Sequence, residues 1–542
     1  MFHTFSYDAQ NHSIQIAFKL WSDFGAHIPL IRSFSMGDNL TRFFHGTTQY
    51  PIFPGEPIRY HYLFFMLVGI LERLGVRIDW ALNVPSALGF ASLLVLLYLI
   101  AKRLFHSKAV GFLTLIFFLF NGSLAFLRFF SLHPLSAQTG SDIIRANQFP
   151  AFAPWGPGLI SAFWNLNIYT NQRHLAPAFA MVLCFLYIII KDQKYTPKQQ
   201  ILRAIPWGII FGVFPYFHPP SLLILAICMI CYFFLYPNSR VFLFTVGVIT
   251  LCISIPQMYH VQSEVKAVAW YPGYIFHNEV VSLRSLPQML WYMVVFWWQN
   301  LGLHSIFILL GFFLISKNAR RALIPILPIF LVPNFFKFSV EASANHKFFN
   351  FVLMLGAMIT AYVLISFVHK AKRQKHLIIT LLMTGLVGVV TLFLILSGVI
   401  DFFVIFNDTK GNLPDIPTNK EATWIKNNTP PNAIFLNSGY LYHPASVAGR
   451  AIFLGWPYFP WSAGYKENRM PIMNVMYETR DQKERCDLLA KYNISYITVE
   501  DVKNDVNLPR IDLAYFLNRY KPVYLSTNQR FAIFTTQELC PP

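Results

Sequence analysis

Apolar runs separated by short polar connections fill the middle of this 542-residue chain. Each run is close to the ~20 residues that an α-helix needs to cross a bilayer, or slightly shorter. The expected spans are 85–104, 109–130, 174–191, 201–217, 219–236, 240–256, 301–316, 322–334, 347–368 and 377–400. The pattern therefore predicts a mainly α-helical protein in which residues 85–400 form a polytopic transmembrane bundle of about ten spans.

Basic side chains concentrate in every second connection between these runs. They are Lys102, Arg103, Lys108, Lys191, Lys194, Lys198, Arg203, Arg240, Lys317, Arg320, Arg321, Lys370, Lys372, Arg373 and Lys375. Short cytoplasmic loops are enriched in Lys and Arg, so these connections are assigned to the cytoplasmic side. The long loops 131–173, 257–300 and 335–346 then face outward. Such irregular segments cannot face lipid and must fold over the bundle. A catalytic or binding site is therefore expected on the extracytoplasmic face.

Residues 1–84 are predicted to form the first extracytoplasmic loop. Ile14, Ala17, Phe18 and Trp21 recur at helical spacing and favour an amphipathic helix on the membrane surface. The apolar run after Arg59, which reaches about Leu74, is too short to span and is expected to be an interfacial helix. This loop is predicted on the extracytoplasmic side, but no transmembrane helix precedes it in this sequence to carry it across the membrane. We therefore expect a preceding transmembrane helix that this sequence lacks.

Residues 401–542 are predicted to be a soluble extracytoplasmic α/β domain. Helices are expected at 422–428 and 483–492, with strands at 433–436 and 496–499. The aromatic stretch 455–461 is of a kind that stacks on sugar rings. Packing of this domain onto the membrane loops is the favoured alternative.

Composition supports a membrane protein, with 55% hydrophobic and 13% charged residues and a mean hydropathy of +0.45. The net charge is +18, but the basic residues lie in the short connections described above, a pattern that does not indicate nucleic-acid binding. Cys228 and Cys231 have a metal-like spacing but lie within an apolar run, where they are read as packing residues and not as metal ligands. Cys486 and Cys540 are the pair in a polar region, where an oxidising compartment would allow a disulfide.

The candidate catalytic and phosphate-binding residues are Asp8 and the charged residues at the start of two spans. Asp8 lies at the start of the expected helix, four residues before His12 on the same face, and is either a general base or a helix N-cap. Arg173 with His174, and Lys347, open two outward-facing span ends. Arg173 and Lys347 are candidates to hold a phosphate, with interfacial snorkelling as the structural alternative.

Several motifs, in this order and on one face, resemble GT-C-type membrane glycosyltransferases related to protein mannosyltransferases and aminoarabinose transferases. They are Tyr7-Asp8-Ala9 with His12, Pro57-Ile58-Arg59-Tyr60-His61-Tyr62, Asn83-Val84-Pro85-Ser86-Ala87, Asn171-Gln172-Arg173-His174-Leu175 and Asn345-His346-Lys347-Phe348-Phe349. The resemblance covers the membrane region, and an α/β domain is a common addition at the C-terminus of such enzymes. This chain departs from the pattern in lacking the first helix and the second acid of an Asp-Glu pair.

The resemblance implies an inverting transfer of a sugar from a polyprenyl-phosphate donor to a glycan, lipid or protein acceptor outside the plasma membrane. Asp8 would be the base, with Asp23 and Asp38 as rival bases because the Asp-Glu pair is missing. The implied donor-binding and substrate-binding residues are His12, Arg59, His61, Arg173, His174 and Lys347. No metal or cofactor is expected beside the lipid-linked sugar. The alternatives are a transporter or flippase and a non-catalytic membrane scaffold.

Overall fold

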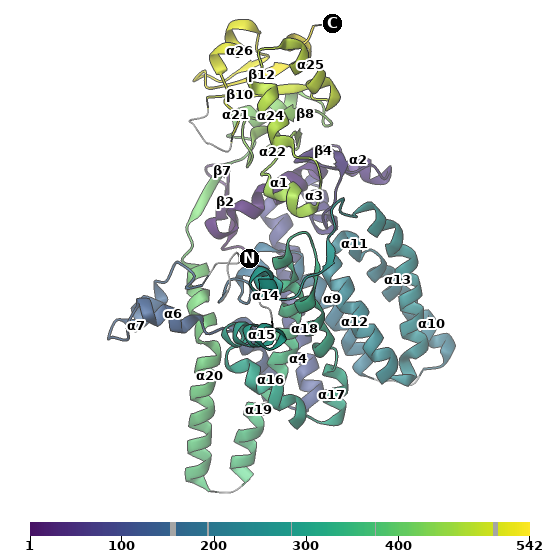
Figure 1. Cartoon of the computed structure of the whole chain (residues 1–542), viewed down its shortest axis with the longest axis vertical. Coiled ribbons are helices and arrows are strands. Elements are labelled where there is room, and N and C mark those ends of the chain that lie inside the picture. Colours follow the sequence, from purple (N-terminus) through teal and green to yellow (C-terminus); the bar gives the residue numbers. More distant parts are fainter. Residues whose placement is uncertain (152–158, 192–194, 283–284, 374–375, 502–507, 542) are drawn as a thin grey trace. The chain divides into compact units, whose positions relative to one another are not determined.

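The computed structural model describes residues 1–151, 159–191, 195–282, 285–373, 376–501 and 508–541 (Figure 1). The chain forms two compact units. Unit 1 contains Met1–Pro85, Met258–Lys266 and Thr409–Pro542, and unit 2 contains Ser86–Gln257 and Ala267–Asp408. The N-terminal region and the C-terminal domain, which the sequence divides into separate parts, thus belong to one unit. Lys194 and Lys375 of the basic connections lie outside the described residues.

Unit 2 consists mainly of helices, with one two-stranded sheet. Its elements are α4 (Ile78–Phe105), α5 (Lys108–Leu119), α6 (Ala125–Leu132), α7 (Thr139–Ile144), α8 (Asn167–Asn171), α9 (Leu175–Ile190), α10 (Pro197–Gly212), α11 (Phe214–Phe217), α12 (Pro219–Leu235), α13 (Arg240–His260), β5 (Val268–Trp270), α14 (His277–Ser282), α15 (Leu286–Leu301), α16 (Leu303–Leu314), α17 (Lys317–Leu323), α18 (Ile326–Phe335), β6 (Phe336–Phe338), α19 (His346–Arg373) and α20 (Leu377–Phe406).

Five helical segments among the described residues are long and apolar enough to cross a membrane, and a sixth results if α15 and α16 count as one span bent by 101°. Helices α5, α9 and α12 are apolar but shorter. The most apolar window of the segment that contains α19 is 72% buried, whereas the other spans reach 28–39%. Because α19 also packs against α5, α16, α18 and α20, it is the central helix of this unit (Figure 1).

The expected span 109–130 is interrupted between α5 and α6. The Ser397 hydroxyl on α20 donates to the Ser123 carbonyl at 2.6 Å and accepts from the Phe126 N–H at 2.9 Å. A Cβ on Gly122 would lie 2.8 Å from the Leu394 carbonyl oxygen, so the backbone approaches α20 closely there. The break therefore exists because α20 supplies hydrogen-bond partners from far along the chain. The prediction of an irregular loop across 257–300 was also wrong, since α14 and α15 lie there.

Unit 1 contains the remaining elements. These are β1 (Phe5–Asp8), β2 (Ser13–Ala17), α1 (Trp21–Ser35), α2 (Asn39–Phe44), β3 (Gln49–Tyr50), β4 (Phe53–Pro57), α3 (Leu63–Arg73), β7 (Lys410–Pro414), α21 (Lys420–Asn428), β8 (Ile434–Leu436), α22 (Pro444–Val447), β9 (Ala451–Ile452), α23 (Tyr458–Ala463), α24 (Arg469–Glu478), α25 (Gln482–Lys491), β10 (Tyr496–Glu500), α26 (Leu513–Arg519), β11 (Tyr524–Leu525), β12 (Phe531–Thr535) and α27 (Thr536–Leu539).

The amphipathic helix predicted near the N-terminus was wrong. Residues 13–17 form strand β2, which pairs antiparallel with β1 on one side and with β7 on the other. Ile14 and Ile16 are buried while Gln15 between them is partly exposed, which is the two-residue alternation of a strand. The helix begins later, as α1 at Trp21. The partner strand β7 lies about 400 positions further along the chain, so local spacing gave no sign of it.

The C-terminal part of unit 1 agrees with the predicted α/β domain. Its five-stranded sheet has the order β11-β12-β10-β8-β9, with β10, β8 and β9 parallel and the other pairs antiparallel. The predicted helices at 422–428 and 483–492 correspond to α21 and α25, and the predicted strands to β8 and β10. Helix α3 coincides with the helix predicted after Arg59.

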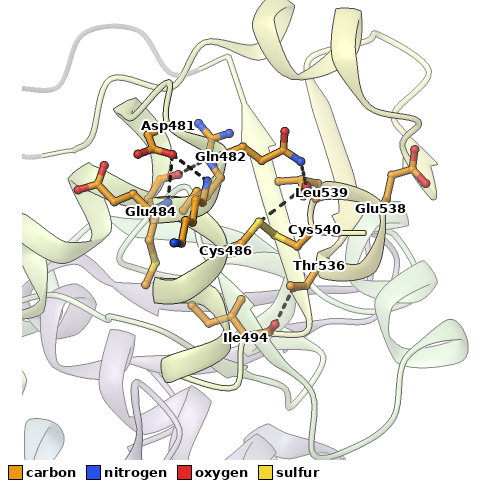
Figure 2. Close-up of a disulfide and its surroundings, with 12 residues drawn as sticks. Asp481, Gln482, Glu484, Cys486, Ile494, Thr536, Glu538, Leu539 and Cys540 are labelled. Carbon is orange, nitrogen blue, oxygen red and sulfur yellow. Dashed lines mark hydrogen bonds between the residues drawn. A yellow bond between two sulfur atoms is a disulfide. The ribbon is translucent and has the colours of Figure 1, made fainter. Parts of the chain in front are cut away.

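Figure 2 shows the disulfide between Cys486 of α25 and Cys540, just after α27. It closes a loop of 54 residues with a Cα–Cα distance of 5.7 Å. On the same surface, the Gln482 side chain donates to the Leu539 carbonyl at 2.9 Å. The cysteine pair that the sequence offered for a disulfide is thus bonded in the structure, and it fastens the chain's end to α25.

A buried ionic group ties three distant segments of unit 1 together. The Arg32 guanidinium of α1 lies 3.0 Å from a carboxylate oxygen of Glu72 on α3 and 3.0 Å from one of Asp415 after β7. The three side chains are 1%, 8% and 10% exposed. The Ser35 hydroxyl donates to the other Glu72 oxygen at 2.6 Å. Charges this deeply buried are tolerated only when paired, so the segments depend on one another.

Replacing Arg32 with Met is therefore expected to destabilise unit 1 strongly. The change leaves Glu72 and Asp415 buried without their cation, a loss of about 3–5 kcal/mol in unfolding free energy. Urea titration of the purified full chain in detergent micelles measures it. Arg42→Met is the matched control, because Arg42 pairs with Asp38 on a surface where the two side chains are 28% and 30% exposed, and a change below about 1 kcal/mol is expected. Equal effects of the two substitutions would contradict the role of the buried group.

Candidate functional site

Among the helices of unit 2 that start at a histidine are α9, α12 and α19. His174 directly precedes α9, His218 precedes α12, and His346 is the first residue of α19. The helices contain 16, 17 and 28 residues. The N-terminal end of a helix has a partial positive charge and backbone N–H groups without intrahelical partners. These starts therefore provide anion-binding chemistry if they lie together.

Local sequence explains why the helices begin at these residues. Pro219 and Pro220 follow His218, and proline suits the first turn of a helix because the N–H it lacks would have no partner there. Before α19, the Asn345 amide donates to the carbonyls of Pro333 and Phe336 at 2.9 and 2.8 Å. That side chain fixes the turn from which His346 emerges.

The three histidines lie close together. The rings of His174 and His218 have centroids 5.3 Å apart. The His218 Nδ1 lies 2.6 Å from the Ser221 hydroxyl. His346 contacts the Gln172 amide through Nε2 at 3.5 Å and the Asn350 amide through Nδ1 at 3.2 Å. All three rings are buried, at 0%, 0% and 3% exposure. We call these histidines, with Arg173 and Lys347, the helix-start cluster.

Two cationic side chains belong to this cluster. Arg173 is 0% exposed and Lys347 is 8% exposed. Burial lowers the pKa of Arg173 to about 9, so its guanidinium stays charged at neutral pH. Burial first, and then the charges of His174, Lys347 and His346, holds the pKa of His218 well below its ordinary value. His218 is thus neutral at pH 7 and serves as a hydrogen-bonding group beside fixed positive charges.

A small cavity, with room for about one water molecule, adjoins the cluster within unit 2. Asn350 lines it and also contacts His346, so this side chain connects the cavity with the cluster. Trp164 and Tyr169 form aromatic walls, and Asn121 adds a second amide. Aromatic and amide side chains therefore form the packing next to the cluster.

The segment 159–174 brings Arg173 and His174 into the bundle, and a buried carboxylate on α20 holds it. The Asn165 amide donates to Asp401 at 2.8 Å, and both residues are at most 2% exposed. The Asn165 carbonyl oxygen in turn accepts from the Asn167 N–H at 2.8 Å, at the start of α8. Asp401 is therefore a positioning residue for the polypeptide that precedes α9.

The proposed base Asp8 lies at the exposed tip of the β1–β2 hairpin in unit 1, not at a helix start. Its carboxylate accepts from the N–H groups of Gln10 and Asn11 at 2.9 and 3.1 Å and from the Asn11 amide at 2.7 Å. These bonds, chiefly the one from the Asn11 side chain, lower the pKa of Asp8. His12 adopts a φ of 45° in the same turn. The expected shared helical face of Asp8 and His12 was wrong, because this stretch is a hairpin.

The rival acids of unit 1 have different surroundings. Asp38 pairs with Arg42 one turn further along α2. Asp23 lies in the first turn of α1 and is partly buried. After burial, its charge contributes to raising the pKa of the Tyr60 and Tyr442 hydroxyls, so Asp23 lies near both phenols.

Arg59 and His61 were predicted to bind the donor, and both have protein partners within unit 1. The Arg59 guanidinium lies 3.1 Å from Glu56 and 2.7 Å from Glu264, and it donates to the Gln262 carbonyl at 2.8 Å. Two carboxylates already balance its charge. The His61 ring is buried and stacks on Tyr60 with centroids 3.8 Å apart.

The sequence singled out Arg173, His174 and Lys347; the charges of His174 and Lys347 act on His218, and Arg173 directly precedes His174 in the chain. The sequence did not assign roles to His218, Asn350 or Asp401. A signal for His218 was present, because a histidine immediately before Pro219-Pro220 marks a helix start between two apolar runs. Nothing local distinguished Asp401, whose partner Asn165 is 236 positions away.

No protein-family model and no curated protein matches the chain. Solved structures that resemble it include oligosaccharyltransferase AglB from Archaeoglobus fulgidus, in complex with an inhibitory peptide and a dolichol-phosphate. That likeness has 14% identity and a TM-score of 0.46, and it covers 96% of this chain and 70% of that one. ArnT from Cupriavidus metallidurans resembles it with 12% identity and a TM-score of 0.47 in the apo state, covering 96% and 94% of the two chains.

ArnT bound to undecaprenyl phosphate gives 10% identity and a TM-score of 0.47, with 97% and 96% of the two chains covered. AglB and ArnT are GT-C glycosyltransferases, the class that the sequence motifs resemble. All these TM-scores are below 0.5. The likenesses therefore transfer no residue roles or substrates to this chain.

The role of Asp401 predicts different outcomes for two substitutions. Asp401→Leu removes the acceptor of the buried Asn165 amide, and leaving such a donor unsatisfied costs about 1–3 kcal/mol. Amide hydrogen exchange in residues 159–174 of the purified chain should then accelerate by about 5-fold to 100-fold. Asp401→Asn is the control, because it keeps an acceptor oxygen and should leave exchange nearly unchanged. Unaltered protection in the Leu variant would show that Asp401 does not hold the segment.

Proposed function

We propose that the chain is a membrane glycosyltransferase that moves a sugar from a polyprenyl-phosphate donor to an acceptor, with inversion at the sugar. The observation that supports this most is the helix-start cluster of unit 2. Three helix N-termini, Arg173 and Lys347 provide the positive potential that a phosphate leaving group requires. The sequence motifs that resemble GT-C-type enzymes include the two stretches that build this cluster.

The proposed step is a single displacement. The acceptor oxygen forms a bond to the anomeric carbon while the bond from that carbon to the phosphate oxygen breaks. The electron pair leaves with the polyprenyl phosphate, and a carboxylate takes the acceptor proton. Arg173 and Lys347 stabilise the charge that develops on the departing phosphate. His174, His218 and His346 orient it by hydrogen bonding, and the step uses no cofactor.

Among the three candidate acids we propose Asp23 as the base, because its charge acts on two phenols of the same unit. Asp8 keeps its carboxylate engaged in its own turn, and a lowered pKa makes it a weaker base. Asp38 is paired with Arg42. After burial, the charge of Asp23 contributes to the raised pKa values of Tyr60 and Tyr442, and the Tyr442 hydroxyl donates to the Trp21 carbonyl. The assignment to Asp8 from the sequence stays a prediction, and the two acids are compared below.

The position of the cluster along α19 supports an extracytoplasmic reaction. The cluster lies at the start of α19, whereas Lys370, Lys372 and Arg373 lie in its last turn. If the basic end is cytoplasmic, the opposite end faces outward. The plasma membrane is the proposed location, and a glycan, lipid or protein is the proposed acceptor. A flippase for lipid phosphates is the alternative, since the same cluster would bind such a lipid without breaking the sugar–phosphate bond.

Arg173→Gln and Lys347→Gln should each lower transfer by about 10²–10³-fold, the usual effect of removing one donor to a developing oxyanion. Purified protein is incubated with a panel of polyprenyl-phosphate sugars, and the free polyprenyl phosphate released is measured. Lys372→Gln is the matched control, because it makes the same change at the exposed far end of α19. Lipid that crosses the vesicle membrane without release of its phosphate would favour the flippase, and equal rates in all three variants would refute the phosphate-binding role.

A second comparison identifies the base. Asp23→Asn should reduce transfer by about 10²–10⁴-fold, because the amide cannot accept the acceptor proton. Asp8→Asn should change the rate less than about threefold, since the amide oxygen still accepts bonds from the turn. If loss of transfer follows Asp8 instead, the assignment from the sequence is correct. If neither variant loses transfer, Asp38 is the remaining candidate among the three acids.

A further inference from the structure

A second cavity of unit 2 lies far along α9 from the helix-start cluster. It lies among the last turn of α9, the first turns of α10 and the start of α13. Ile188 and Ile189 of α9 line it, whereas the cluster is at the other end of this helix, next to Leu175. The proposed reaction does not use this cavity.

The buried side chain of Gln200 shapes the cavity. It is 7% exposed, donates to the Tyr195 carbonyl at 3.1 Å, and accepts from the Phe242 N–H at 3.0 Å. The bond to Phe242 joins α10 to the first turn of α13. At the start of α10, Thr196 and Gln199 form a capping box. The polypeptide around the cavity is thus fixed by its own hydrogen bonds.

The cavity has a polar side and an apolar side. The Arg203 guanidinium lies 4.2 Å from the centre of the Tyr195 ring, and stacking on an aromatic face leaves the edge of a guanidinium able to donate. The Asn238 amide and the Ser239 hydroxyl also line the cavity and add donors. Ile189 and Phe242, both buried, provide the apolar side.

This end of the helices is rich in positive charge. Lys191, Lys198 and Arg240 are exposed there, beside Arg203. The segments that contain α10 and α13 are long and apolar enough to span a membrane, so their ends lie near the level of lipid headgroups. Basic pockets between transmembrane helices on the cytoplasmic side are suited to anionic lipid headgroups. The charge and the position agree with that type of ligand.

We infer that this cavity binds the phosphate of an anionic glycerophospholipid. Arg203, Asn238 and Ser239 donate hydrogen bonds to the phosphate, and the upper part of an acyl chain lies against the isoleucines and Phe242. Free inorganic phosphate offers the same polar chemistry but leaves the apolar side of the cavity without a partner. A lipid uses both sides.

Native mass spectrometry of the purified full chain tests the inference, with phosphatidylglycerol as the probe and phosphatidylcholine and inorganic phosphate as comparison ligands. Wild-type protein should retain one phosphatidylglycerol more tightly than phosphatidylcholine. Arg203→Gln should weaken this binding at least 5-fold. Lys198→Gln is the matched control, because it removes a charge on the same helix without lining the cavity. Ile188→Trp should also weaken binding, because it fills the cavity without changing the charge.

Several results would overturn the inference. Equal losses in the Arg203 and Lys198 variants would mean that the lipid responds only to the surface charge. Retained affinity in Ile188→Trp would place the lipid elsewhere. Displacement of phosphatidylglycerol by millimolar inorganic phosphate would show a free-anion site, and equal retention of phosphatidylcholine would remove the selectivity for anionic lipids. Each variant's thermal unfolding temperature is compared with that of wild type, so that misfolding is not mistaken for weakened binding.

Discussion

Irregular backbone persists inside an apolar bundle only where side chains satisfy its N–H and C=O groups, and unit 2 depends on this constraint. The break between α5 and α6 is held by Ser397, and segment 159–174 by Asp401 through Asn165. Asn345 does the same before α19. In each case a polar side chain holds non-helical chain within the bundle. The last two of these segments lead directly to the helix-start cluster.

The constraint also explains why the cluster is buried. When a helix starts inside the bundle, the N–H groups of its first turn are buried there. The imidazole rings of residues such as His218 are buried beside them. Arg173 adds a full charge at 0% exposure. Burial strengthens every electrostatic interaction at such a place, because little water is present to screen it. The proposed binding of a phosphate by this cluster relies on that strengthening.

The sequence predicted those features that depend on local composition. The apolar runs that became α4, α13, α19 and α20, and the α/β elements near the C-terminus, were visible because their patterns are local. The positions of Arg173 and Lys347 at span ends were also predictable, since charge beside an apolar run marks a boundary. Features that depend on distant partners were not predictable. Strand β2 was read as a helix because the alternation of Ile14 and Ile16 is short, and β7 pairs with it from the other end of the chain.

That pairing has a consequence for the order of folding during synthesis. Strand β2 is complete at Ala17, but its partner β7 begins at Lys410, after the whole of unit 2 has been made. At translation rates of about 5–20 residues per second, the β1–β2 hairpin waits roughly 20–80 seconds with one edge unpaired. Exposed strand edges invite wrong pairing. A hairpin made before unit 2 is thus closed only after it, and during that interval a chaperone can protect its open edge.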